Sequence, residues 1–291
     1  MNSCRHDAFV ATTRICKIVA DTLKVPMISN KTDAEMFADD YDIILLKTGV
    51  MLFCDFRERM LDMLEKAKKV IVLDNDYAFK IDSRVRKIIA GKTITWNSAE
   101  STSPNSLYIN WNRVGWLPVK HFKHTHKGLF YYGSCRKDRE EDFVKYMGSK
   151  KYPVLLSCDK RNMEQYSKII PAKEVTFFAR WSHPKHLTAF DHAMYIEDET
   201  SHTLFTSPAQ RFYEYVSAGL AVIIDSKCET TFEKAGLPKF KQFMVSNSDE
   251  VAEIIKRDDG RKLAKKQMRT WDRDYIADLK YDIKNLWRVT I

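Results

Sequence analysis

The stretch Thr206–Asp225, TSPAQRFYEYVSAGLAVIID, decides the fold predicted for this chain. Ser207 can cap a helix, and the proline that follows it fits the first helical position. We expect the helix to run to Ala218, with Gly219 supplying a left-handed exit. Leu220–Ile224 is a continuous apolar run, typical of a strand covered on both faces. The stretch therefore predicts a capped helix that leads into the buried strand of an α/β protein.

A carboxylate lies inside this predicted helix, because Glu214 stands among Phe212, Tyr213 and Tyr215. Helices of parallel α/β folds begin at the sheet edge that binds ligands, and their amino ends favour anions. An acidic side chain here could hold the hydroxyls of a ribose. The alternative is an ordinary crossover helix with one exposed glutamate, because such helices are common in doubly wound folds.

Composition narrows the class of protein. The chain has 291 residues, long enough for two domains, and its 44% hydrophobic content can fill two cores. A net charge of +9 favours a polyanionic partner, either nucleic acid or a phosphorylated substrate. Six scattered cysteines without a Cys-x-x-Cys pair argue against a structural zinc site or a disulfide framework. Without an apolar signal-peptide core or a membrane-length apolar segment, we expect a soluble cytoplasmic protein with no membrane partner.

Strand and helix patterns alternate along the chain and predict parallel sheets with right-handed crossovers. Strands are expected at Val25–Ser29, Asp42–Thr48 and Val70–Leu73 in a first half, and a second series starts at Gly128. The boundary lies near residue 125. The second half would end near residue 270, and 271–291 would form a helix that packs back on the first half.

A second glycine loop, YYGSCRKDR, spans Tyr131–Arg139 after an apolar strand. Gly133 lets the backbone approach a ligand, and Arg136 can donate two hydrogen bonds to a diphosphate. Arg180 directly follows the predicted strand VTFFA and could neutralise phosphates there. The alternative for these arginines is a solvated position at an ordinary strand end.

These motifs resemble GT-B glycosyltransferases, in which a Glu in a helix before an SAGL-like stop contacts the donor ribose. The matching residues are Arg211, Glu214 and Ser217-Ala218-Gly219. The string YYGSCRKDREEDFVKY is similar to the YGxxRxxR…FxxY segment of phage-encoded glycosyltransferases that modify DNA bases. The turn Asn75-Asp76-Tyr77 resembles a similarly placed segment of those enzymes.

The resemblance implies a GT-B fold: an acceptor domain at 1–125 and a nucleotide-sugar domain at 126–270, both Rossmann-like, with parallel sheets facing a central cleft. It implies transfer of a sugar from a uridine diphosphate sugar, such as UDP-glucose, to the hydroxymethyl group of a 5-hydroxymethylpyrimidine in DNA. Asp76 would be the general base. No cofactor is required, and a divalent metal is not expected because cations stabilise the leaving diphosphate. The nucleotide-sugar residues would be Gly133, Arg136, Arg180, Gln210, Arg211 and Glu214.

A basic stripe recurs at helical spacing near the end of the second half, at Lys262, Lys266, Arg269 and Arg273. Such a stripe could follow the phosphates of double-stranded DNA, although a solvated helix face is the commoner meaning of a charge run. We expect the first domain, with this basic surface, to present the acceptor base. Two tryptophans of the connection, Trp111 and Trp116, could stack on an extruded base or could simply pack.

Other interpretations stay open. Asp74-Asn75-Asp76 could hold a metal ion as a D-x-D string, and His121, His124 and His126 cluster without the partners of a convincing metal site. A GT-B enzyme acting on a glycan, lipid or small acceptor is one alternative. A non-enzymatic nucleic-acid-binding protein is the other.

Overall fold

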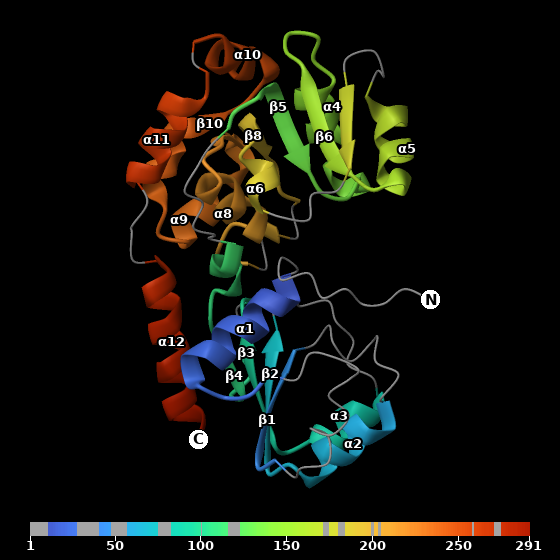
Figure 1. Ribbon diagram of the computed structural model, residues 1–291, viewed down its shortest axis with the longest axis vertical. Coiled ribbons are helices and arrows are strands. Elements are labelled where there is room, and N and C mark those ends of the chain that lie inside the picture. Colours follow the sequence, from blue (N-terminus) through green and yellow to red (C-terminus); the bar gives the residue numbers. More distant parts are fainter. Residues whose placement is uncertain are drawn as a thin grey trace. The chain divides into compact units, whose positions relative to one another are not determined.

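The chain divides into two compact units, Met1–Val114 with Asp274–Ile291 and Gly115–Arg273 (Figure 1). The boundaries expected from the sequence were 125 and 270. The computed structural model describes residues 11–27, 41–47, 57–74, 83–99, 101–115, 123–170, 175–179, 184–198, 201–202, 205–257, 259–270 and 275–291.

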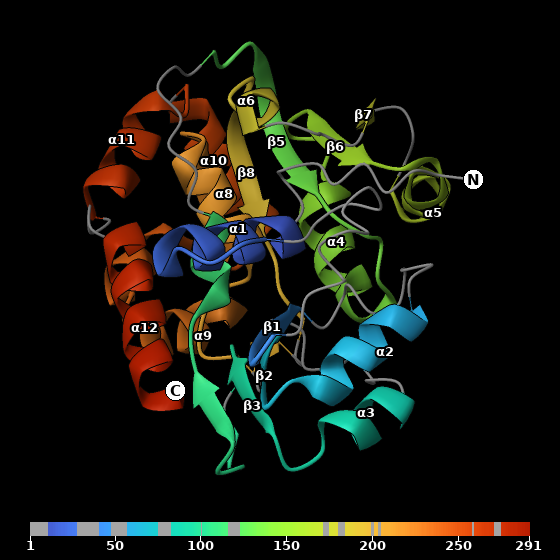
Figure 2. The same cartoon turned by 60° about the horizontal axis from the view of Figure 1, so that its bottom comes forward.

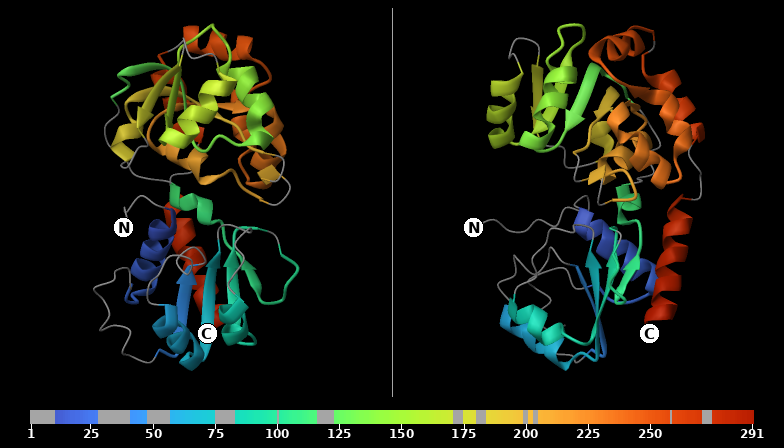
Figure 3. Two further views of the ribbon diagram at one scale, coloured as in Figure 1. Left: turned by 90° about the vertical axis from the view of Figure 1, so that its right-hand side faces the viewer. Right: turned by 180° about the vertical axis from the view of Figure 1, so that it is seen from behind.

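The first unit contains a four-stranded parallel sheet in the order β1-β2-β3-β4. Helices α1 and α12 cover one face of this sheet, and α2 and α3 cover the other (Figures 1 and 3). The strands are β1 (Ile43–Lys47), β2 (Lys69–Asp74), β3 (Thr93–Asn97) and β4 (Ser106–Tyr108). The helices are α1 (Ala11–Leu23), α2 (Arg57–Lys66), α3 (Ser83–Ile89) and α12 (Tyr275–Thr290).

Strand β2 is apolar at four consecutive positions, Val70–Leu73, because helices cover both faces of the sheet. Val70 and Val72 pack with α2 and α3, whereas Ile71 and Leu73 pack with α1 and α12. All four side chains are buried. Because successive residues of a strand point to opposite faces, a strand covered on both faces needs apolar residues at every position.

The last helix, α12, belongs to the first unit. Leu279 and Ile283 are fully buried in the same cluster as Ile15 of α1. The indole N–H of Trp96 donates a hydrogen bond to the hydroxyl of Thr290, with 3.2 Å between Nε1 and Oγ1. These contacts tie the end of the chain to the sheet formed near its beginning.

Two sequence predictions for the first unit differ from the structure. Residues 25–27 form no strand, and the rest of the strand expected at Val25–Ser29 lies outside the described residues. The connection after β3 contains a short strand, Ser106–Tyr108, that was not predicted. Its residues pair with β3 although they lack the apolar run of a central strand.

The second unit contains a six-stranded parallel sheet in the order β10-β9-β8-β5-β6-β7. Its strands β8, β5, β6 and β7 are labelled in Figure 2. The strand order reverses at β5, which has β6 on one side and β8 on the other. Such a reversal opens a crevice at the carboxyl ends of the two strands. The strands are β5 (His126–Tyr132), β6 (Val154–Cys158), β7 (Val175–Ala179), β8 (Phe190–Tyr195), β9 (Ala221–Asp225) and β10 (Met244–Val245).

Helices α4, α5 and α10 pack on one face of this sheet, α8 contacts β8 and β9, and α11 contacts β9. A short helix, α9 (Glu229–Lys234), follows β9. The bounds of the others are α4 (Glu140–Met147), α5 (Lys160–Ile169), α8 (Gln210–Ser217), α10 (Ser248–Arg257) and α11 (Arg261–Thr270). Among the described residues, no helix is long and apolar enough to cross a membrane.

The helix–glycine–strand unit of the opening stretch forms as predicted, except at its start. Helix α8 begins at Gln210 with Ala209 as its N-cap residue, so Ser207 is not the cap. The backbone N–H of Ala209 donates instead to the hydroxyl of Tyr195, at 2.7 Å. Gly219 has a φ of +77°, which confirms the left-handed exit, and all of β9 is buried.

Helix α11 is fixed to the sheet by one side chain. Gln267 is fully buried, and its amide donates to the carbonyl of Val222 at 2.6 Å and accepts from the N–H of the same residue at 2.8 Å. Strand β10 pairs with Ile224 and Asp225 of β9. The Gln267 amide therefore pairs with β9 in the place that a longer β10 would take.

Candidate functional site

Three segments of the second unit meet beside the reversal of strand order. The Gly133 loop follows β5, Glu197 and Asp198 follow β8, and α8 supplies Arg211 and Glu214. Hydrogen bonds and ion pairs join all three segments. The sequence-predicted residues Gly133, Gln210, Arg211 and Glu214 are thus brought together at the sheet edge where open α/β folds bind ligands.

Glu214 is buried, with 3% of its surface exposed. Its carboxylate accepts hydrogen bonds from the hydroxyl of Tyr132 and from the side-chain amide of Gln210, the latter at 2.9 Å. Glu214 is therefore not the exposed glutamate that the alternative of an ordinary crossover helix assumes. A buried carboxylate needs such donors, and they fix the direction in which it points.

Arg211 lies under the glycine loop. Its guanidinium donates to the carbonyl of Tyr132 at 2.9 Å and to the hydroxyl of Tyr131, and it lies 3.4 Å from the carboxylate of Glu197. The same group stacks 4.7 Å from the centre of the Tyr131 ring. These contacts hold the end of β5 and place a buried positive charge directly beneath the turn at Gly133.

A second buried arginine, Arg139, joins the segment after β5 to the segment after β8. Its guanidinium lies 2.5 Å from the carboxylate of Asp198 and 3.2 Å from that of Glu197. It also donates to the hydroxyl of Tyr131 at 3.3 Å. Arg139, Arg211, Glu197 and Asp198 form a balanced set of two cations and two anions, which lets four charges remain buried.

This buried set perturbs the acidity of Asp198. Burial acts to raise the pKa of this carboxyl, but hydrogen bonds from Arg139 and from the N–H of Ser201 outweigh it and lower the pKa to about 2. The carboxylate is also 3.2 Å from Arg136. Asp198 is therefore a permanent anion at neutral pH, and it positions Arg136 at the rim of the site.

Arg136 is an exposed cation of the loop, with 45% of its side chain exposed. It pairs with Asp138 at 2.5 Å as well as with Asp198. A guanidinium has five N–H donors in a planar fork, so two carboxylate contacts leave it able to donate to an incoming anion. Of the two predicted phosphate-binding arginines in the described part of the chain, Arg136 faces solvent and Arg211 does not.

Gly133 is required by both conformation and space. Its φ is +146°, and a Cβ at this position would lie 2.6 Å from a guanidinium nitrogen of Arg211. The loop beyond it is held by Asn162 of α5, whose side-chain oxygen accepts from the N–H of Cys135 at 2.6 Å. The absence of a side chain at Gly133 lets the backbone lie directly on the buried Arg211.

Sequence reasoning missed several residues of this site. Glu197 and Asp198 follow the apolar run Ala193–Ile196 at the end of the buried strand β8, and two carboxylates directly after such a run are a usable signal. The loop sequence alone does not distinguish Arg139 from its charged neighbours. Its burial depends on partners almost sixty positions away, at Glu197 and Asp198. The sequence does not indicate that Tyr132 contacts Glu214, because both residues lie among other aromatic residues.

Other predicted residues lie elsewhere. Lys262, Lys266 and Arg269 are exposed on α11, which lies in the second unit as their place in the second half of the sequence implies, so they do not form a surface of the acceptor domain. Asp76, Arg180 and Arg273 lie outside the described residues, as do Trp116 and His121.

Trp111 is packed in the core of the first unit and is not exposed to stack on a base. It is fully buried, stacks on Trp96 with 6.5 Å between ring centres, and donates its indole N–H to the Trp96 carbonyl. In the described part of the chain, no group of three or more His, Cys, Asp or Glu side chains could hold a metal ion.

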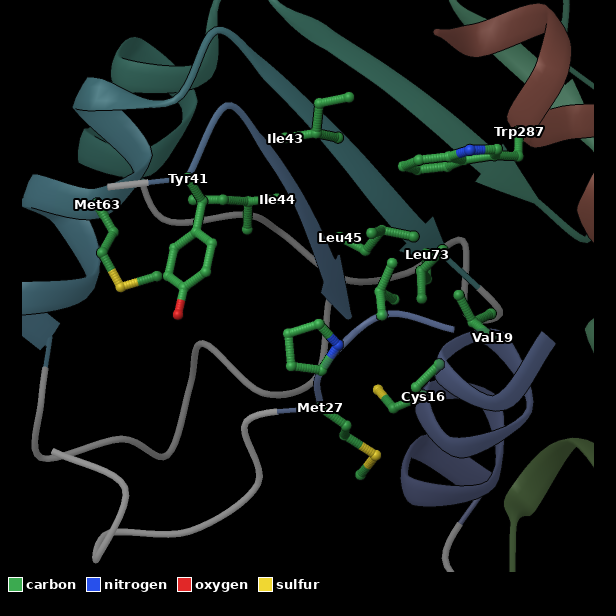
Figure 4. A pocket seen from close by; sticks show the side chains of 13 residues that line it. Cys16, Val19, Met27, Tyr41, Ile43, Ile44, Leu45, Met63, Leu73 and Trp287 are labelled. Atoms are coloured by element: carbon green, nitrogen blue, oxygen red, sulfur yellow. The ribbon is translucent and has the colours of Figure 1, made fainter. Parts of the chain in front are cut away.

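The first unit contains an apolar pocket of about 320 Å³ between α1, β1 and α12 (Figure 4). Cys16 and Trp287 lie on its helical walls, and Tyr41 and Met63 lie near β1 and α2. Leu73, the penultimate residue of β2, completes the wall. The pocket thus adjoins the carboxyl end of the strand that leads into Asn75-Asp76-Tyr77.

Comparison with known proteins identifies the architecture. A crystal structure of T4 phage BGT in complex with its UDP-glucose substrate matches with a TM-score of 0.64 at 13% identity, covering 96% of this chain and 92% of that one. A mutant of T4 phage BGT with UDP-glucose matches with a TM-score of 0.69 at 13% identity, over 97% and 94% of the two chains. The chain has the GT-B fold.

A third match is a DNA-modifying β-glucosyltransferase, with a TM-score of 0.67 at 13% identity over 95% of this chain and 92% of that one. No family model and no curated protein sequence matches the chain. The resemblance to GT-B glycosyltransferases inferred from the motifs is thus confirmed at the level of structure.

Proposed function

We propose that the protein transfers a sugar from a uridine diphosphate sugar, such as UDP-glucose, to the hydroxymethyl group of a 5-hydroxymethylpyrimidine in double-stranded DNA. The observation that carries this proposal is the buried, oriented carboxylate of Glu214 beside the Gly133 loop, at the reversal of strand order. The structures that match over the whole chain include a glucosyltransferase with bound UDP-glucose and a DNA-modifying enzyme.

In this proposal Glu214 accepts hydrogen bonds from the ribose hydroxyls, and Gln210 and Tyr132 hold it in place. The diphosphate lies over the Gly133 turn, where Arg136 donates to it directly. Arg211 acts from beneath the turn, because a positive charge buried under a short loop still lowers the energy of an anion above it. Arg180, the residue that follows β7 in the sequence, adds a further cation.

The reaction itself needs one proton acceptor. Asp76 takes the proton of the acceptor hydroxyl, whose oxygen then bonds to the anomeric carbon of the sugar. The bond from that carbon to the diphosphate breaks, and UDP leaves with the electron pair. The arginines stabilise the departing charge without a metal ion. A solved complex of T4 phage BGT with UDP and Mn²⁺ makes the effect of added Mn²⁺ worth measuring.

The deciding experiment incubates the protein with duplexes that contain 5-hydroxymethylcytosine, 5-hydroxymethyluracil or only unmodified bases, each with a panel of nucleotide sugars. The DNA is then digested to nucleosides for mass spectrometry. We expect a hexose adduct on one hydroxymethylated base with one UDP-sugar. UDP-sugar binding without a DNA adduct would instead favour a glycan, lipid or small acceptor. DNA binding without nucleotide binding would favour the non-enzymatic alternative.

The role of Asp76 has its own test with a matched control. Asp76→Asn should lower the transfer rate by a factor of about 10² or more while UDP affinity stays unchanged, because only the proton acceptor is lost. Asp74→Asn removes a neighbouring carboxylate and should retain most of the rate. Equal losses in the two variants would contradict the assignment of the base to Asp76.

A further inference from the structure

A basic groove lies on the second unit, over α11 and the end of α10. We use "basic groove" for the hollow of about 480 Å³ lined by Arg257, Lys262, Leu263, Lys265, Lys266 and Arg269. Five of these six residues carry a positive charge, and helix α11 contains no acidic residue. The groove therefore combines a concave shape with a single sign of charge.

Most of this charge is not neutralised. Arg257 pairs with Glu253 at 2.9 Å. Among the described residues, Lys262, Lys265, Lys266 and Arg269 form no ion pair. The ammonium group of Lys266 lies over the ring of Phe243, with 5.4 Å from Nζ to the ring centre, a cation–π contact that holds this charge without neutralising it. Four cations held side by side repel one another unless an anionic partner binds them.

The spacing of the cations fits a phosphate backbone. Lys262, Lys265, Lys266 and Arg269 follow one face of α11 at intervals of three and four residues. With a rise of about 1.5 Å per residue, the stripe is roughly 10 Å long. One strand of B-DNA advances about 3.4 Å along the axis per phosphate, so the stripe spans about three phosphates.

The opposite face of α11 is rigidly held. Gln267 bonds to both backbone groups of Val222, and Ala264 is buried against the sheet. The helix can therefore neither rotate nor slide without breaking two buried hydrogen bonds. The cations are presented in a fixed direction, which reduces the entropy lost when a partner binds.

We propose that the basic groove binds the sugar–phosphate backbone of duplex DNA without regard to base sequence. The inference rests on DNA being the acceptor in the proposed function, and it adds that the sugar-nucleotide unit grips the duplex through a surface of its own. The groove adds Arg257 and Lys265 to the DNA-binding residues predicted from the sequence. The groups that these cations bind are the phosphates of the backbone.

The test measures the affinity of the full chain for a short unmodified duplex between about 50 and 200 mM salt. The variant Lys262→Gln/Lys266→Gln/Arg269→Gln removes three groove charges. A matched control, Lys127→Gln/Lys150→Gln/Lys168→Gln, removes three exposed charges of the same unit outside the groove. In the groove variant, the slope of log K against log salt should fall by about 3, and affinity should fall about tenfold or more. The control should change the slope by less than about 1.

Binding of UDP-glucose, measured on the same three proteins, should be equal and would show that the donor site is intact. Equal loss of DNA affinity in the groove variant and the control would overturn the proposal, because it would reflect the net charge of the chain alone. Absence of DNA binding by the parent protein would overturn it as well. If DNA binding is salt-sensitive and depends on the groove, but no sugar adduct forms, the proposed function is refuted. The proposal that the groove binds DNA then still holds.

Discussion

Replacement of Glu214 by Gln tests the donor site most directly. The two side chains have the same shape, and the amide of Gln210 can flip to offer its oxygen to the new amide group, so the fold should survive. Hydrogen bonds to a charged acceptor contribute about 1.5–3 kcal/mol and neutral ones about 1 kcal/mol. With two ribose hydroxyls, the loss is about 2 kcal/mol, or roughly 30-fold in the dissociation constant of UDP.

The assay is calorimetric titration with UDP and with 2′,3′-dideoxy-UDP, on the parent protein and on Glu214→Gln. If Glu214 holds the ribose hydroxyls, removing these hydroxyls should weaken nucleotide binding by the parent protein far more than nucleotide binding by the variant. The reason is that the mutation and the removal of the hydroxyls both abolish the same interaction. Tyr132→Phe removes only the hydrogen bond that orients Glu214, and it should raise the dissociation constant of UDP about fivefold. Additive effects of the carboxylate and the hydroxyls would refute the reasoning.

Three further outcomes follow from the second unit. Gln267→Ala should lower the free energy of unfolding by about 2–4 kcal/mol in urea melts, because a buried N–H and a buried C=O of β9 lose their partners. Gly133→Ala should weaken UDP binding, because its Cβ would displace the guanidinium of Arg211, whereas Gly236→Ala, at another position of positive φ with open space around the Cβ, should not. The pKa of Asp198, about 2 in the folded protein, is below the ordinary 3.8, so its ionised form stabilises the fold above pH 3.8 and this contribution is lost as the pH falls towards 2. Asp198→Asn should therefore lower stability at pH 6, and its difference from the parent protein should shrink as the pH is lowered to 2.

The architecture could be predicted because its signals are local. An apolar strand after Gly219 and a glycine turn after β5 indicate parallel α/β structure within a few residues. The predicted loop and helix do meet, since both lie at carboxyl ends of neighbouring strands of one sheet. Local pattern also placed Glu214 on the correct helix.

The partners of these residues could not be predicted, because they are set by tertiary contacts. Ser207 looked like a helix cap, but the hydroxyl of Tyr195 takes the N–H that decides where α8 begins. The enclosure of Arg211 by Tyr131 and Glu197 is a second contact of this kind. Strand order decides which arginine becomes buried, and a short sequence segment does not reveal strand order.

The amide of Gln267 has a consequence beyond stability. Because β10 pairs only with the end of β9, the backbone of Val222 would otherwise face outward as an open sheet edge. Open edges are templates on which another chain can add a strand. A single side chain closes this one, so its loss should promote self-association through β9, visible as concentration-dependent growth in light scattering.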